Sequence, residues 1–124
     1  LSQKIPMVAL FPYTNSKLKN NNGSEALNED NLVCRAIRHI KKKYKNQIGI
    51  MCDVALDPYT SHGHDGLSKS GYVLNDETID ILTKQALLFL EKPFKKHREL
   101  SKKKGKAKSL SLTTRPPLVL ARLS

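Results

Sequence analysis

The sequence predicts an α/β fold in which two parallel strands are joined by a helix. Two short apolar runs, residues 6–11 and 48–54, have the length and composition of buried strands. Between them, apolar side chains recur at the spacing of a helix as far as Tyr44. A strand, a helix and a strand at this spacing form a βαβ unit, whose strands pair in parallel through a right-handed crossover.

The first strand is expected over residues 6–11, which read PMVALF, and should end at Pro12. An apolar run without polar alternation is typical of a strand buried on both faces. Residues 13–28 are polar, and Gly23 follows three consecutive asparagines. This composition predicts a surface loop.

Asn28 is the predicted N-cap of the first helix, with Glu29 and Asp30 in a first turn where negative charge favours the helix dipole. The opposite face carries His39 and several basic side chains, which we interpret as a solvated surface rather than a phosphate-binding patch. The apolar stripe comprises Leu32, Val33, Ala36, Ile37, Ile40 and Tyr44.

The second strand leads into residues 53–66, DVALDPYTSHGHDG, which we call the acidic segment. Functional side chains in α/β folds gather at the carboxyl ends of parallel strands, which is where Asp53 is expected. Carboxylates and imidazoles concentrated there suit metal or proton chemistry. The alternative is a loop whose side chains only cap backbone groups.

Residues 57–74 are expected to form two short strands or an extended loop, with residues 72–74 returning toward the core. Asn75 should cap a second helix that has Asp76 and Glu77 in its first turn. Pro93 should end this helix, with a further helical stretch as far as Leu100 as the alternative. The predicted apolar stripe comprises Ile79, Leu82, Ala86, Leu87 and Leu90.

The 124-residue chain carries a formal net charge of +11, and this excess is concentrated near its end. Residues 1–88 have a net charge of +2, whereas residues 89–124 have +9. We therefore interpret residues 89–124 as a basic Lys/Ser-rich tail without regular structure. Cys34 and Cys52 lie in apolar segments without CxxC spacing, which predicts buried, reduced thiols.

Several segments resemble, in register, the porphobilinogen synthase family, also called δ-aminolevulinic acid dehydratase. The resemblance covers about residues 5–88 and stops before the basic tail. It implies that residues 1–88 are part of a (β/α)8 barrel, with two parallel strands, two helices and one active-site loop. The abrupt loss of resemblance suggests a truncated or frame-shifted reading frame, with a genuine basic tail as the alternative. The matching segments are VALFP, EALNEDNLVCRAIRHIKK, IGIMCDVALDP, DVALDPYTSHGHDG and GYVLNDETIDILTKQAL.

The resemblance also implies roles for the acidic segment. In zinc-using members of the family, cysteines stand at the positions of Ala55, Asp57 and Asp65. Here carboxylates replace thiolates, which indicates Mg²⁺, with a monovalent cation as the alternative, and makes zinc improbable. The metal ligands are predicted to be Asp57, Asp65 and His64. Asp53 and Ser61 are the predicted catalytic residues, with Asp53 orienting the amino group of the second substrate.

The family condenses two 5-aminolevulinate molecules through two Schiff-base lysines on later barrel strands. Lys69 and Lys84 lie in a loop and on a polar helix face, so neither is suited to lose its proton near neutral pH. A complete barrel needs roughly 250 residues. We therefore expect this chain alone to be inactive. Members of the family form homo-oligomers of octamer type.

Two other functions remain to be distinguished. A small basic nucleic-acid-binding protein would act through residues 92–108, although no aromatic platform or binding module accompanies that stretch. A metal-dependent hydrolase would use His62 and His64, although these follow the strand by about eight residues. No apolar run reaches the roughly 18 residues that span a bilayer, so no membrane partner is expected. The expected location is the cytoplasm, with a plastid or another organelle as the alternative.

Overall fold

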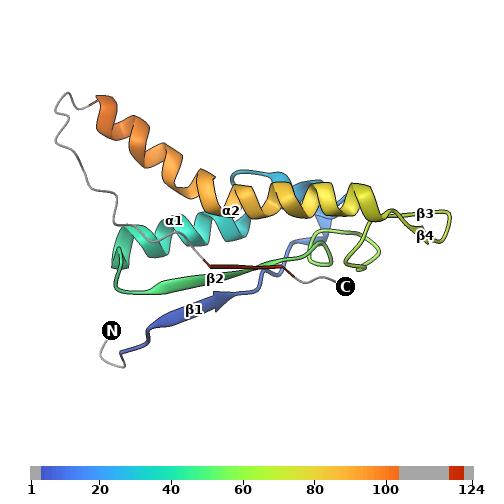
Figure 1. Ribbon diagram of the computed structural model, residues 1–124, viewed down its shortest axis with the longest axis horizontal. Coiled ribbons are helices and arrows are strands. Elements are labelled where there is room, and N and C mark those ends of the chain that lie inside the picture. The colour runs from blue at the N-terminus through green and yellow to red at the C-terminus, as the bar shows by residue number, and fades with distance from the viewer. Residues whose placement is uncertain (1–3, 104–117, 122–124) are drawn as a thin grey trace.

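The computed structural model describes residues 4–103 and 118–121. Two helices and three longer strands make up most of the described chain, together with two 3-10 turns and a short hairpin (Figure 1). In chain order the elements are β1 (Met7–Leu10), η1 (Ser16–Leu18), η2 (Ser24–Leu27), α1 (Leu32–Tyr44), β2 (Gly49–Val54), β3 (Ser68–Lys69), β4 (Tyr72–Val73), α2 (Asn75–Lys103) and β5 (Leu118–Ala121).

The three longer strands form one parallel sheet in the order β1-β2-β5. Val8 is paired with Ile50 between β1 and β2, and Cys52 is paired with Val119 between β2 and β5. The crossover from β1 to β2 passes through α1, which confirms the predicted βαβ unit. The structure is thus an α/β segment of the kind expected from a parallel barrel.

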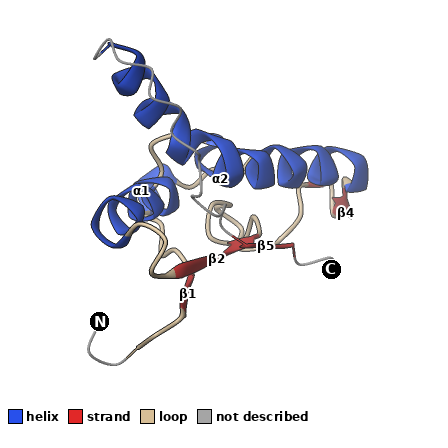
Figure 2. Ribbon diagram, turned by 60° about the vertical axis from the view of Figure 1, so that its left-hand side comes forward, coloured by secondary structure: helices blue, strands red, loops and turns tan. Residues whose placement is uncertain are grey.

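Both helices lie over the same face of the sheet (Figure 2). Side chains alternate along β2, so Ile50, Cys52 and Val54 are buried beneath the helices. The helices supply the other half of this core, with Val33, Cys34 and Ile37 from α1 and Leu88 and Phe89 from α2. Burial of these apolar side chains is the main stabilising contribution to the described fold.

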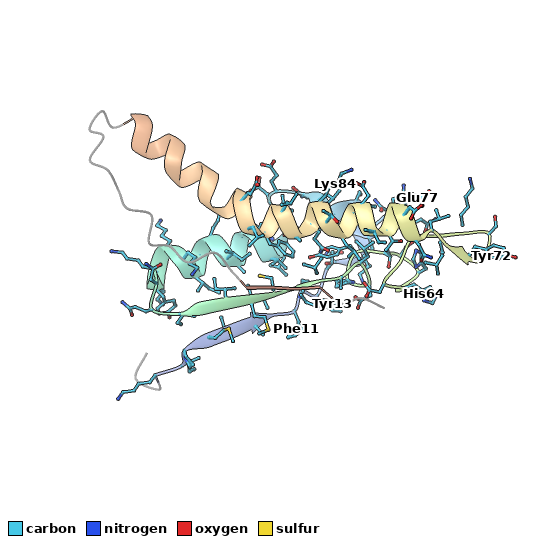
Figure 3. All side chains as sticks on the ribbon, in the orientation of Figure 1. Phe11, Tyr13, His64, Tyr72, Glu77 and Lys84 are labelled. Carbon is cyan, nitrogen blue, oxygen red and sulfur yellow. The ribbon has the colours of Figure 1, made fainter. Side chains whose placement is uncertain are left out.

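Strand β1 is not buried on both faces, contrary to the prediction. Val8 and Leu10 pack against the core, but Met7 and Ala9 are exposed. The two pairs point to opposite faces of the sheet, and only one face is covered by helices. Phe11, directly after β1, is 65% exposed and is labelled in Figure 3. The second layer that a doubly buried strand requires is therefore not supplied by the described residues.

The first helix begins three residues later than predicted. Asn31, rather than Asn28, is its N-cap, because Asn31 Oδ1 accepts a hydrogen bond from the Cys34 N–H at 2.9 Å. Asn31 Nδ2 also donates to the carbonyl groups of Glu25 and Ala26, which ties the cap to η2. Asn28 instead accepts from the Asp30 N–H within the preceding turn. Glu29 and Asp30 consequently precede the helix.

Asp76 and Glu77 lie in the first turn of α2, as predicted, but Asn75 is its first helical residue rather than its N-cap, because the Leu74 carbonyl accepts the Thr78 N–H at 3.0 Å. The helix continues past Pro93 to Lys103. Its second half turns away from the first (Figure 1), which is the usual effect of a proline inside a helix. The predicted apolar stripe is confirmed in part, because Leu82 and Ala86 pack against the core, whereas Ile79 and Leu87 are exposed. The residues of this helix that are buried are Thr78, Gln85, Leu88 and Phe89.

The segment between β2 and α2 contains two short antiparallel strands, β3 and β4, which was one of the two predicted arrangements. Tyr72 and Val73 do not return to the core, because they are 78% and 61% exposed. The basic tail also differs from the prediction where it is described, since residues 118–121 form β5. The apolar sequence LVLA explains this, because such residues favour a strand beside β2.

Candidate active site

Asp53 lies near the carboxyl end of β2, as predicted for a functional residue of an α/β fold. It alternates with Cys52 and Val54, so its side chain is directed to the face of the sheet opposite the helices. Its backbone is paired with Leu120 of β5, and its side chain is partly buried. This strand end places a carboxylate on the face where a parallel barrel would have its interior.

Asp57 lies in a tight turn immediately after the strand. The N–H groups of Tyr59 and Thr60 both donate to the Leu56 carbonyl, at 2.8 and 3.0 Å, and close the turn. Asp57 Oδ1 is buried and makes no hydrogen bond with any residue that the structure describes. Buried carboxylate oxygens are nearly always paired, so this atom is suited to a cation or an ordered water.

Asp65, at the end of the acidic segment, contacts the backbone just after β2. Its Oδ1 accepts a hydrogen bond from the Leu56 N–H at 2.7 Å. Leu56 is the neighbour of Asp57, so this bond joins the two ends of the loop that carries both aspartates. Asp65 therefore has a backbone-capping role in addition to any role in metal binding.

The two histidines contact each other. Their rings stack with centroids 5.4 Å apart, and His62 Nδ1 accepts a hydrogen bond from the His64 N–H at 3.2 Å. His62 is partly buried, whereas His64 is exposed toward the end of the molecule where α2 begins (Figure 3). The contact gives His62 a structural role in the loop.

Ser61 lies where the acidic segment contacts the loop after β1. Its hydroxyl donates a hydrogen bond to Asn21 Oδ1, and its N–H donates to the Asn20 carbonyl at 3.0 Å. Asn20 also donates its N–H to the Tyr59 carbonyl at 3.2 Å. These bonds join the two loops that follow β1 and β2. A catalytic use of the Ser61 hydroxyl would require it to leave Asn21.

Two residues of α2 that the sequence reasoning missed hold the acidic segment in place. Gln85 is fully buried, and its Nε2 donates to the Ala55 carbonyl at 3.1 Å. Thr78 Oγ1 accepts from the Leu67 N–H at 2.9 Å and donates to the Leu74 carbonyl at 2.6 Å. The available signal was the presence of polar residues at positions 78 and 85 of a helix, seven residues apart and hence on one face.

Three buried side chains with ionisable groups, Cys34, Cys52 and Tyr59, lie in the core near the acidic segment. Burial raises the pKa of the Cys52 thiol to about 12 and that of Cys34 to about 11. Burial also raises the pKa of the Tyr59 hydroxyl, which lies near Gln85. Both cysteines are free thiols, as predicted. High thiol pKa values disfavour the thiolate form, so neither cysteine is suited to act as a nucleophile or metal ligand near neutral pH.

The acidic segment offers oxygen donors of the type that a hard cation prefers, but only from two aspartates. Ala55 offers no side-chain donor, and the oxygens of Asp57 and Asp65 match the ligand preference of Mg²⁺ rather than Zn²⁺. Within residues 4–103 and 118–121, however, no three Asp, Glu, His or Cys side chains are grouped to hold a metal ion. Mg²⁺ commonly uses one or two carboxylates and keeps several waters, so two aspartates are compatible with this ion.

A hollow in the described surface lies beside the site rather than within it. It is formed mainly by the loop after β1 and the start of α1, and it shares only Tyr59 with the acidic segment. Its lining therefore contains none of the predicted catalytic or metal-binding residues. The lining residues are Tyr13, Thr14, Asn15, Leu18, Glu25, Leu32, Arg35 and Tyr59.

The parallel strands, the crossover helix and the carboxylates at the end of β2 define a segment of an α/β barrel-type enzyme. The profile of the delta-aminolevulinic acid dehydratase family matches residues 1–92. The chain belongs to this family. The match ends near the point where the resemblance was predicted to stop.

Two curated relatives show the extent of the similarity. A delta-aminolevulinic acid dehydratase from Bradyrhizobium diazoefficiens is 59% identical over 87 residues, which are 70% of this chain and 24% of the relative. A chloroplastic delta-aminolevulinic acid dehydratase from Pisum sativum is 53% identical over 81 residues, which are 64% of this chain and 20% of the relative. The chain thus spans about a quarter or less of the length of these relatives.

A solved structure agrees with the fold. The delta-aminolevulinic acid dehydratase (porphobilinogen synthase) from Toxoplasma gondii, in complex with the reaction product porphobilinogen, matches with a TM-score of 0.64 and 30% identity. The match covers 91% of this chain and 34% of that structure.

Proposed function

We propose that this chain is a segment of a porphobilinogen synthase, which condenses two 5-aminolevulinate molecules to porphobilinogen with loss of water. The observation that carries the proposal is the family match over residues 1–92, in which Asp53 occupies the carboxyl end of a parallel strand. A carboxylate there can orient the amino group of a substrate through a charge-assisted hydrogen bond. Ser61, the other predicted catalytic residue, remains a candidate for the same site.

Mg²⁺ is the proposed metal, with a monovalent cation as the alternative. Asp57 and Asp65 would hold it, and His64 remains a predicted additional ligand. The buried, unpaired Oδ1 of Asp57, judged within the described residues, supports the cation. The bound metal would supply positive charge beside the substrate site, while Asp57 and Asp65 contribute oxygen ligands of the type that hard cations prefer.

The segment is proposed to lack the covalent steps of the reaction. Lys69 is exposed in the hairpin, and Lys84 forms an ion pair with Asp80 at 2.5 Å on the exposed face of α2. Neither lysine lies in the buried, apolar environment that a Schiff-base lysine requires. Conversion of 5-aminolevulinate would therefore need barrel strands that supply the Schiff-base lysines.

Assembly, location and domain division are proposed on the same basis. A homo-oligomer of octamer type is proposed for the complete enzyme. The proposed domain division assigns residues 1–88 to the barrel segment and residues 89–124 to the basic tail. No helix in the described ranges is both long and apolar enough to cross a bilayer. A cytoplasmic location is proposed, with a plastid as the alternative that the chloroplastic names of the plant relatives support. The alternative of nucleic-acid binding concerns residues 92–108, whose side chains lie outside the described part of the chain.

Titration calorimetry with MgCl₂ tests the metal proposal. The purified chain is expected to bind Mg²⁺, and Asp57→Asn and Asp65→Asn are each expected to weaken binding by at least tenfold because each removes a charged oxygen ligand. The Asn at residue 65 keeps an oxygen that can accept the Leu56 N–H. Asp76→Asn is the matched control, because Asp76 is exposed in the first turn of α2.

Equal binding by all four proteins would contradict the metal assignment. A separate assay addresses the covalent steps. The chain with 5-aminolevulinate and Mg²⁺ is expected to form no porphobilinogen above background, measured by colorimetric detection of the pyrrole. Product formation by the chain alone would overturn the proposal that the Schiff-base machinery is missing.

A further inference from the structure

Two side chains of α2 bind the backbone before Asp57 and after Asp65. Gln85 Nε2 contacts the Ala55 carbonyl, directly after β2, at 3.1 Å. Thr78 Oγ1 contacts the Leu67 N–H at 2.9 Å and the Leu74 carbonyl at 2.6 Å, where the loop leads back into the helix. The Ala55 carbonyl and the Leu67 N–H have no ladder partner described above, whereas the Leu74 carbonyl also accepts the first backbone hydrogen bond of α2, from the Thr78 N–H at 3.0 Å. Side chains of one helix therefore satisfy both ends of one loop.

Thr78 and Gln85 lie on the same face of α2. They are seven residues apart, which is two helical turns and about 10 Å along the axis. Both are buried, at 8% exposure for Thr78 and 0% for Gln85, and the apolar Leu82 lies between them and packs against the core. Buried polar side chains weaken a helix face unless they are hydrogen-bonded. The loop contacts satisfy Thr78 Oγ1 and Gln85 Nε2, whereas Gln85 Oε1 is buried and makes no hydrogen bond with any described residue.

The backbone after Asp65 is held by Thr78 through the Leu67 N–H, two residues further along. Gly66, between them, lies close to β4, because a Cβ added there would be only 3.1 Å from Val73 Cγ1. At the other end, Gln85 fixes Ala55, two residues before Asp57. Each aspartate is thus adjacent to a point where α2 holds the chain.

We propose that Thr78 and Gln85 are positioning residues that keep the carboxylates of Asp57 and Asp65 in a cation-binding arrangement. This inference rests on the proposed function, because it assigns the cation affinity of the loop to α2. Neither residue contacts the cation. They act through Ala55 and Leu67, and the Leu56 N–H to Asp65 bond, at 2.7 Å, joins the two held ends. Helix α2 is then the element that sets the affinity of the site.

The experiment compares variants of one helix in the full chain. Thr78→Val removes the hydroxyl without changing the shape of the side chain, and Thr78→Ser retains it. Thr83→Val is the matched control, because Thr83 Oγ1 donates only to the Ile79 carbonyl at 2.8 Å and is exposed. Gln85→Met tests the second contact with a side chain of similar length. The measurements are Mg²⁺ affinity by calorimetry and hydrogen exchange of the Leu67 amide by NMR.

Thr78→Val is expected to accelerate Leu67 amide exchange about tenfold, the effect of losing one hydrogen bond, and to weaken Mg²⁺ binding by a similar factor. Gln85→Met should weaken Mg²⁺ binding to the same extent. Thr78→Ser should restore both properties, and Thr83→Val should change neither by more than about twofold. This rescue by serine separates positioning from a general loss of stability, which urea unfolding of each variant monitors.

Two results would overturn the inference. One is a Thr78→Val chain that binds Mg²⁺ as tightly as the original chain. The other is a Thr83→Val chain that loses as much affinity as Thr78→Val. If the original chain binds no Mg²⁺, the metal assignment of the proposed function fails instead. In that case the exchange rate of the Leu67 amide alone tests whether Thr78 holds the loop. Equal exchange rates in the original and Thr78→Val chains would refute that role.

Discussion

Raising the pH from 8 to 10 is expected to destabilise the fold through Cys34 and Cys52. Burial raises the pKa of these thiols to about 11 and about 12 from an ordinary value of 9.0. Between pH 9 and pH 11 the unfolded chain therefore releases both protons while the folded chain keeps them. The unfolded state binds fewer protons in this window, so the free energy of unfolding falls as the pH rises.

The size of the effect follows from the two pKa values. Each thiol contributes a loss of about 1.4 kcal/mol for every pH unit above its unfolded pKa and below its folded pKa. At pH 10 the two thiols together remove about 3 kcal/mol of stability relative to pH 8. A small domain has about 5–15 kcal/mol in total, so this loss is a large share.

Urea unfolding followed by circular dichroism at pH 8, 9 and 10 measures the effect. The control is a Cys34→Ala and Cys52→Ala double variant, which is less stable at every pH but lacks the two thiol protons. Lysine and tyrosine titration affects both proteins alike, so the difference between their pH slopes isolates the thiols. Equal slopes in the two proteins would refute the reasoning, because they would mean that burial does not hold the thiols in their neutral form.

Three further predictions concern stability and use urea unfolding at neutral pH. Phe89→Ala should lower the free energy of unfolding by about 3–5 kcal/mol, because Phe89 is fully buried in the core, and a loss below 1 kcal/mol would contradict that packing. Asn31→Ala should lower it by about 1–2 kcal/mol through loss of the α1 cap, whereas Asn28→Ala should cost less; the reverse order would restore Asn28 as the cap. Lys84→Gln should change it by less than about 0.5 kcal/mol, since its ion pair with Asp80 is exposed, and a larger loss would show that the pair is stabilising.

The central part of the fold could be predicted because its signals are local. Residues 48–54 form a run that is apolar apart from Gly49 and Asp53, and the apolar spacing after Leu32 specifies a helix whatever surrounds it. The N-cap of α1, by contrast, could not be identified from the local sequence. Asn28 and Asn31 are equally good caps by residue type, and the choice depends on the Glu25 and Ala26 carbonyls that Asn31 binds.

Burial and site contacts depended on residues distant in sequence. The sequence of β1 does not reveal that its second face is uncovered by the described residues. The aspartates were placed at the strand end correctly, because strand direction alone determines that position. Their surroundings were not predictable, since Gln85 reaches Ala55 across 30 residues. The extension of α2 through Pro93 was foreseen only as the alternative, because a proline signals a helix boundary only on average.

The exposed side of β1 has a consequence for the behaviour of the chain in solution. In the described sheet β1 has β2 as its neighbour on one edge, and Ile5, Met7 and Phe11 lie exposed along it. Such an edge is a template for intermolecular strand pairing. The net charge of +11 keeps copies apart at low ionic strength, where repulsion extends over tens of ångströms. Added salt shortens that range, so precipitation should set in as ionic strength increases.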